Sequence, residues 1–354
     1  LIGFALMGVV LVAFSYYNQP SQEEIRERQR QDSIARVNLE KQELAMEEAK
    51  AHAEAERMAH QAALMTDSTS LFFNSKNLQE QTISLENEWG KYELSSKGGL
   101  IKQATLKNFT MQDRVTPVSL FGNEADYMDF AIAGKQDNVV ASELLMEPVN
   151  ASKDGVTFRL AMGEGHIDFA YQLQPESYML NLEIKAEGVA KYFNPSTQTL
   201  TVSLHEKAKQ LEKGYTFENR YSTLTYQDSD GDTHYLDQSG NDSEDSEEPL
   251  DWVAFKNQFF RCAFIAGQTF GNAKLYSNTL EQGSGFLKEY DVQANTAFDP
   301  TGKQPTQMQF YFGPNHFQTL QAHNDLSVNG KDLELEELVD LGWPLFRWIN
   351  RFIT

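Results

Sequence analysis

Alternating aspartates are the first candidates for chemistry in this sequence. Asp228, Asp230 and Asp232 are spaced like the opening ligands of a calcium-binding loop. The EF-hand pattern then requires Gly after the third acid and Glu at the twelfth position, where this chain has Thr233 and Ser239. We therefore expect a mobile acidic loop here and no calcium site.

Histidines are the second candidates, because imidazole can bind a metal or transfer a proton. His316 and His323 are seven residues apart and would share one face of a helix, but no cysteine lies near them to complete a metal site. The sequence contains no Walker loop and no G-x-S-x-G, H-E-x-x-H or C-x-x-C motif. We expect no catalytic residue, no metal and no cofactor.

The single cysteine, Cys262, could supply a nucleophile but cannot form an intramolecular disulfide. It lies in an apolar run, which favours a small buried hydrophobic role. An outward-facing domain would then depend on its own core for stability.

Net charge is −21, and its distribution excludes some partners. Residues 228–251 contain ten acidic side chains and no Lys or Arg. The chain offers no basic face for nucleic acid and no polybasic segment for anionic lipid.

The elements that would position any site begin with an apolar run. Residues 1–17 carry no charge and end in Tyr16 and Tyr17, aromatic residues that suit a membrane–water interface. We expect an uncleaved transmembrane anchor; a cleavable signal peptide and a buried core helix are the alternatives. The first charges after the run, Glu23 and Glu24, favour a cytoplasmic N-terminus, with the remainder facing outward.

Residues 18–66 are rich in Ala, Glu, Gln, Arg and Lys, which favour helix. No apolar heptad seam persists, so we expect a charged helical linker that separates the next domain from the membrane.

Residues 67–334 are patterned as β-structure. Apolar and polar residues alternate over 178–187, as in a half-buried strand. Similar short runs separated by Gly, Pro and Asp turns occur at 92–95, 100–106, 156–162, 166–173, 198–204, 285–292 and 307–312. Helical patterns are nearly absent before a short helix expected at 314–323, so the fold class is mainly β, an antiparallel sandwich.

Residues 335–354 return to helical spacing and are rich in aromatic residues. Trp343, Phe346, Trp348 and Phe352 would lie, with Tyr16 and Tyr17, at the membrane interface. The alternative is a helix packed on the sandwich.

Four stretches in this order resemble the front part of the YidC-type membrane protein insertases. They are IGFALMGVVLVAFSYYNQ (2–19), DWVAFKNQFF (251–260), FYFGPN (310–315) and LGWPLFRWINRF (341–352), with a supporting Gly98–Gly99 turn. The resemblance implies a periplasmic β-supersandwich, similar in fold to mutarotase-like domains, anchored in the inner membrane.

The resemblance also implies a chaperone and insertase role: inserting, folding and assembling inner-membrane proteins, alone or with the Sec translocon. Nascent membrane proteins, the translocon with its accessory subunits and the lipid bilayer would be the partners. No further apolar span follows Phe352, so we expect this chain to supply an anchor and a partner-contact domain, with the insertase core absent from it.

A membrane-anchored sandwich that binds a carbohydrate or peptide is the alternative function. Mutarotase-like catalysis needs a His and a carboxylate that converge in a cleft. His166 and Asp168, with Glu164 nearby, would share a strand face, whereas His205 and Glu206 would diverge because adjacent strand residues point to opposite sides. We therefore expect no enzymatic activity.

Overall fold

The computed structural model describes residues 67–75 and 77–339, together with positions 56, 59, 62 and 63. The chain divides into two units, 1–60 and 61–354, and nearly all of the first lies outside the described residues. The second unit contains the folded body described below. Within these described ranges, no helix combines the length and the apolar character that a membrane crossing requires.

A small antiparallel sheet forms first, from strands that follow one another along the chain. Its order is β1 (Thr82–Glu86), β2 (Gly90–Ser95), β3 (Leu100–Thr110), β4 (Pro117–Phe121). The Gly98–Gly99 turn between β2 and β3 has positive φ at both residues, +80° and +61°, which is why glycine is needed there.

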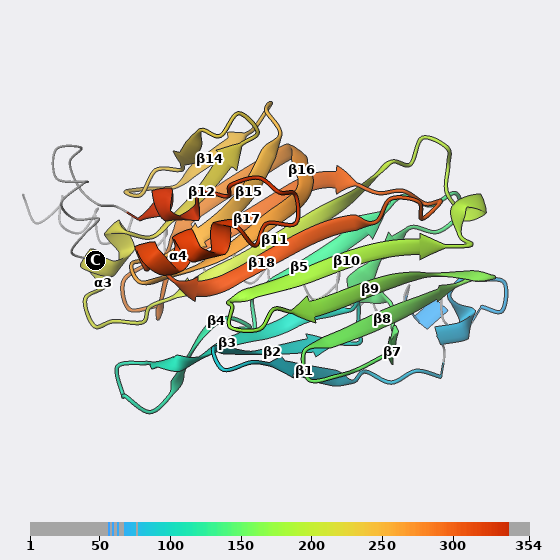
Figure 1. The fold of residues 1–354 in the computed structure, drawn as a ribbon, viewed down its shortest axis with the longest axis horizontal. Coiled ribbons are helices and arrows are strands. Elements are labelled where there is room, and N and C mark those ends of the chain that lie inside the picture. Colours follow the sequence, from blue (N-terminus) through green and yellow to red (C-terminus); the bar gives the residue numbers. More distant parts are fainter. Residues whose placement is uncertain (1–55, 57–58, 60–61, 64–66, 76, 340–354) are drawn as a thin grey trace, which may run out of the picture. The chain divides into compact units, whose positions relative to one another are not determined.

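A large antiparallel sheet makes up the rest of the body (Figure 1). Its main path is β6 (Val139–Val140), β5 (Tyr127–Ile132), β11 (Thr199–Lys209), β17 (Phe286–Ala297), β16 (Phe260–Thr279), β18 (Thr306–Pro314), β10 (Met179–Glu187), β9 (Gly165–Leu173), β8 (Gly155–Met162), β7 (Glu147–Val149). Off this path lie β12 (Thr223–Asp228), β13 (Thr233–Tyr235), β14 (Asp242–Asp245) and β15 (Leu250–Lys256). The helical turns are η1 (Phe73–Ser75), η2 (Ala141–Glu143), η3 (Ala190–Tyr192), α3 (Tyr215–Arg220), α4 (Phe317–Asn324) and η4 (Leu335–Leu338).

Strand β16 joins the two parts of the large sheet. Its first residues, 260–266, pair with β18 and β15, whereas residues 271–279 pair with β17 and, over part of that length, β14. The register shifts between Gly271 and Lys274, and Asn272 has a positive φ of +49°. A bulge of this kind bends a strand, so β16 can belong to both parts.

Apolar residues fill two cores on opposite faces of the β15–β16–β18 region. The inner core includes residues of both sheets, among them Tyr92, Phe264 and Phe310. The outer core includes Trp252 and Tyr311 with residues of α4 and the 333–335 segment. Alternation along each strand therefore serves both cores, and the body is an antiparallel β-supersandwich.

Most strand predictions are confirmed. The 178–187 pattern forms β10, and the other runs form β2, β3, β8, β9, β11, β17 and β18. Three details differ. Helix α4 begins at Phe317, because Pro314 still belongs to β18 and His316 is the N-cap. Helix α3 lies where the sequence predicts no helix, and the acidic stretch, predicted to be a mobile loop, contains β13 and β14. Pairing of β14 with β16 orders part of that stretch despite its charge.

Candidate functional site

Two of the stretches that carry the family resemblance meet where the described chain leaves the body. Residues 251–260 span most of β15, the following turn and the first residue of β16, and residues 310–315 span the end of β18 and the residue after it. Around them lies a set of buried and partly buried hydrogen bonds that we call the C-terminal junction. It consists of Trp252, Asn257, Arg261, Asn315, Asn324 and the segment 333–336.

Arg261 is the central side chain of the C-terminal junction. Its Nη1 donates to the Leu335 carbonyl at 2.9 Å, and its Nε donates to Asn315 Oδ1. The residue is 1% exposed, and Nη2 has no hydrogen-bond partner among the described residues. Burial lowers the pKa of Arg261 to about 10, so the guanidinium stays charged at neutral pH.

Asn315 connects Arg261 to the turn between β15 and β16. Its Nδ2 donates to the carbonyls of Asn257 and Phe260, at 2.7 and 3.2 Å. Asn257 in turn accepts the backbone N–H groups of Phe259 and Phe260 on its side-chain oxygen. The end of β18 and this turn are therefore held as one unit.

Two further contacts hold the segment after α4. Trp252 Nε1 donates to the Leu333 carbonyl at 2.9 Å, and Asn324 Nδ2 donates to Glu336 Oε2 at 2.6 Å. Asn324 Oδ1 also accepts the Leu335 N–H. Because these groups are buried, their hydrogen bonds fix the path of the chain up to η4.

A small cavity of about 170 Å³ lies beside the C-terminal junction. Its lining includes Glu206, Asp126 and Cys262 from the interior and Asn257 and Phe260 from the junction side. Glu206 is 6% exposed, and its Oε2 has no partner among the described residues.

The electrostatics of this cavity favour neutral groups. Burial, reinforced by the charge of Asp126, holds the pKa of the Glu206 carboxyl well above its usual range. Burial also raises the pKa of the Cys262 thiol, which is the chemistry of an inert structural cysteine. The expected buried, hydrophobic role of Cys262 is confirmed.

The alternating aspartates do not converge as metal ligands. Asp228 caps a turn, because its Oδ1 accepts the N–H groups of Asp230 and Asp232, both at 3.0 Å, and its Oδ2 contacts His234. No cluster of three or more His, Cys, Asp or Glu residues suited to a metal occurs within the described ranges.

His316 and His323 have separate structural roles. His316 is the exposed N-cap of α4 and accepts the Thr319 N–H. His323 is buried, accepts the Tyr178 N–H on Nε2 at 3.1 Å and contacts the Thr319 carbonyl through Nδ1. They form no shared face.

His166 and Asp168 share a strand face, as expected, with Nε2 and Oδ2 3.6 Å apart. Asp168 also accepts two hydrogen bonds from Arg159, at 2.8 and 2.7 Å, and forms an ion pair with it. Glu164 pairs instead with Lys191.

His205 and Glu206 diverge, as expected. His205 Nδ1 contacts Asp291 Oδ1 at 2.7 Å and its ring stacks on Tyr127, whereas Glu206 lies inside. The His205–Asp291 pair joins neighbouring strands, β11 and β17, which sequence spacing alone cannot reveal.

The predicted interface residues, Tyr16, Tyr17, Trp343, Phe346, Trp348 and Phe352, lie outside the described residues. Sequence reasoning missed Arg261, Asn315 and Asn324. The available signal was an Arg between Phe260 and Cys262 in an otherwise apolar run, since such a cation must find buried acceptors.

Comparisons with known proteins identify the family to which the chain is related. The profile of the YidC periplasmic domain matches residues 82–354. The chain is 46% identical to a membrane protein insertase YidC of Phocaeicola vulgatus, over 100% of this chain and 56% of that protein. It is 41% identical to the insertase of that name from Bacteroides fragilis, over 99% of this chain and 56% of the relative. The chain thus spans about half the length of these curated relatives.

Two solved structures are more distant. An active YidC insertase structure matches 78% of this chain and 48% of its own, with a TM-score of 0.34 and 13% identity. A galactose mutarotase related enzyme from Lactobacillus acidophilus matches 66% of this chain and 97% of its own, with a TM-score of 0.40 and 9% identity. Both TM-scores are below 0.5, so neither likeness supports an inference about ligands.

Proposed function

This chain belongs to the YidC family of membrane protein insertases, and from that premise we propose that it anchors and positions a periplasmic body during the insertion and folding of inner-membrane proteins. The body itself does no catalysis. It holds a rigid surface for partners and fixes where the chain leaves toward the membrane.

The C-terminal junction is the observation that supports this proposal. Arg261, Trp252 and Asn324 hold the segment 333–336 through buried hydrogen bonds. A rigid exit would transmit the orientation of the body to the residues that follow, since buried networks restrict local motion. This is the geometry expected of a positioning domain.

The proposed organisation has four parts. Residues 1–17 cross the inner membrane with the N-terminus in the cytoplasm, and residues 18–66 form a helical linker. Residues 67–334 form the periplasmic body, and residues 335–354 form an amphipathic helix in the membrane interface. Tyr16, Tyr17, Trp343, Phe346, Trp348 and Phe352 would contact the lipid headgroup region.

The proposed partners are nascent membrane proteins, the lipid bilayer and the Sec translocon with its accessory subunits. The net charge of −21 makes nucleic acid an unsuitable partner. Contact with the translocon would occur through the body, because the body is the largest folded surface of the chain.

Site-specific crosslinking in cells tests the role of the body. We expect the intact protein to crosslink to Sec components and nascent membrane proteins, and a variant lacking residues 70–330 to lose the Sec crosslinks. Equal crosslinking of both proteins would show that the body has no docking role.

A further inference from the structure

Three large apolar side chains are exposed at one end of the body. Val115 is 78% exposed at the β3–β4 turn, Phe217 is 54% exposed on α3, and Phe259 is 43% exposed in the β15–β16 turn. We call these three residues the end surface. Single exposed apolar residues are common on protein surfaces, whereas apolar residues gathered in one place mark interaction sites, so what matters is whether these three lie together.

Direct contacts bring the three loops of the end surface together. Gln112 Nε2, near Val115, donates to the Leu211 carbonyl just before α3, at 2.9 Å. Phe109 of β3 packs edge-on against Phe260, with ring centroids 5.2 Å apart. Figure 1 shows α3, α4 and the β3–β4 turn at the same end of the body.

The end surface also adjoins the C-terminal junction. The Phe259 carbonyl accepts the Asn315 N–H at 2.7 Å, and Asn315 bonds to Arg261, which holds Leu335. These bonds therefore link the end surface to Leu335, and the described chain ends four residues later, at Val339. The sequence that follows, 341–352, is rich in Trp, Phe and Leu.

Val115, Phe217 and Phe259 are the apolar tips of the end surface, and the backbone N–H of each is hydrogen-bonded within the protein. Asp113 Oδ1 accepts the Val115 N–H at 2.9 Å, and Asn257 Oδ1 accepts the Phe259 N–H at 3.0 Å. The Phe217 N–H donates to the Gly214 carbonyl at 3.0 Å. Because an unsatisfied N–H is costly to remove from water, such tips can enter an apolar environment at a lower free-energy cost.

We propose that the end surface inserts Val115, Phe217 and Phe259 into the outer interface of the lipid bilayer. The exposed charges beside the tips nearly balance: Arg114, Lys213 and Arg220 are basic, while Asp113 and Glu212 are acidic. Attraction to anionic lipid is therefore not the main force, and burial of apolar surface is. This inference deepens the proposed function, because it gives the body a fixed height and tilt at the membrane.

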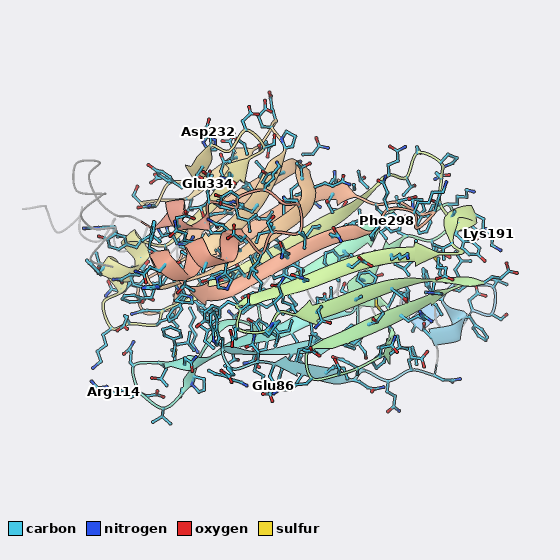
Figure 2. All side chains as sticks on the ribbon, viewed as in Figure 1. Glu86, Arg114, Lys191, Asp232, Phe298 and Glu334 are labelled. Atoms are coloured by element: carbon cyan, nitrogen blue, oxygen red, sulfur yellow. The ribbon has the colours of Figure 1, made fainter. Side chains whose placement is uncertain are left out.

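The end surface lies at one end of the body, away from Lys191. Figure 2 shows Arg114 at this end, Lys191 at the opposite end and Asp232 on a different side. A flat bilayer that touches the three tips would leave Lys191 in water. This difference provides a positional control.

Environment-sensitive labels in the full chain test the proposal. Single cysteines replace Val115, Phe217, Phe259 or Lys191 in a Cys262→Ala background, and each carries an NBD fluorophore. After reconstitution into phosphatidylcholine liposomes, we expect blue-shifted emission and at least twofold quenching by nitroxide-labelled lipid at the three tips. Lys191 should give a water-like spectrum. Water-like spectra at all three tips would overturn the proposal.

Further measurements separate the alternatives. Quenching that disappears in 0.5 M NaCl, or that requires an added protein, would contradict direct apolar contact with lipid. A triple V115S/F217S/F259S variant should reposition the body without lowering its thermal stability, and Tyr276→Ser is the matched control, since Tyr276 is exposed on a strand. Sec crosslinks with water-like tips would disprove only this inference. Quenched tips without Sec crosslinks would disprove only the proposed function.

Discussion

Arg261 is a buried cation without a carboxylate partner among the described residues. Desolvation of the guanidinium costs free energy, and its hydrogen bonds to Leu335 and Asn315 offset that cost. Since no buried anion depends on Arg261, an apolar replacement leaves only two acceptors without their donor. A lysine, in contrast, would keep the charge and lose the two-pronged geometry.

We therefore predict that Arg261→Met changes the free energy of unfolding by less than about 1.5 kcal/mol but frees the segment 333–339. Hydrogen exchange of that segment should accelerate at least tenfold. Arg261→Lys should destabilise the body by roughly 2–3 kcal/mol, because an ammonium with fewer bonds stays buried. Equal destabilisation by both variants in urea titrations would contradict this view of the junction.

His323 links stability to pH at the same outer core. Burial lowers the pKa of this imidazole, and its Nε2 accepts the Tyr178 N–H. The unfolded chain therefore binds the proton more readily than the folded body. The stabilising contribution is complete above the unfolded pKa of about 6.5 and is lost as the pH falls below it toward the folded pKa.

We expect the urea midpoint of the wild-type chain to fall between pH 7.5 and pH 5.0 more steeply than that of His323→Gln. The variant is less stable at pH 7.5, since it loses the imidazole ring that stacks on Tyr178, but it lacks this titration. His316→Gln is the control, because His316 is an exposed cap. Identical pH slopes for wild type and His323→Gln would show that His323 does not contribute to the pH dependence.

At the scale of elements, the packing at the end of β18 explains why the FYFGPN stretch has a glycine at position 313. The Tyr311 hydroxyl donates to the Pro314 carbonyl at 2.9 Å, so its ring folds across Gly313. A Cβ on Gly313 would lie 2.5 Å from that ring. The strand needs a residue without a side chain at this position.

Gly313→Ala should accordingly lower the free energy of unfolding by about 1–3 kcal/mol through overpacking. Gly240→Ala is the matched control, because the nearest atom to its added Cβ is 3.8 Å away and no positive φ is involved. Chemical denaturation of both variants measures the difference. A Gly313→Ala variant as stable as the control would mean that Tyr311 moves aside freely.

The success of sequence reasoning varied between elements. Period-two alternation identified β10 because one face is buried and the other is not. Strand β16 was not predicted, because residues 260–266 are buried on both faces and the run therefore shows no alternation of apolar and polar residues. The strand β14 within the acidic stretch was not predicted either, since it pairs with a strand more than 25 residues away along the chain.

The C-terminal junction could be predicted only in part. The 251–260 and 310–315 stretches were noticed through their resemblance to a family, not through a physical rule. Arg261, Asn315 and Asn324 act through contacts that join residues up to 74 positions apart, and no local pattern encodes such contacts. Val115, Phe217 and Phe259 can be read from the sequence as apolar residues, but that they are exposed becomes known only from the folded chain.

At the scale of the whole body, the inner core is shared by the two sheets. Tyr92 of β2 lies 5.9 Å from Phe312 of β18, measured between ring centroids, and Phe121 of β4 lies 6.1 Å from it. The small sheet also contacts β8 through Gly99, whose added Cβ would meet Phe158 at 3.1 Å. Neither sheet can lose its structure without exposing apolar surface of the other.

We therefore predict a single unfolding transition for the body, despite its two sheets. Gly99→Ala in the small sheet is strained by its positive φ of +61°, and Gly313→Ala in the large sheet is overpacked, so both should shift the same transition. Near-UV circular dichroism and intrinsic fluorescence should give coincident curves for each variant. Two resolved transitions, with each variant shifting only one of them, would mean that the sheets unfold independently. The body would then not be the rigid element that a positioning role requires, because a tilt set at the end surface would be lost between the sheets.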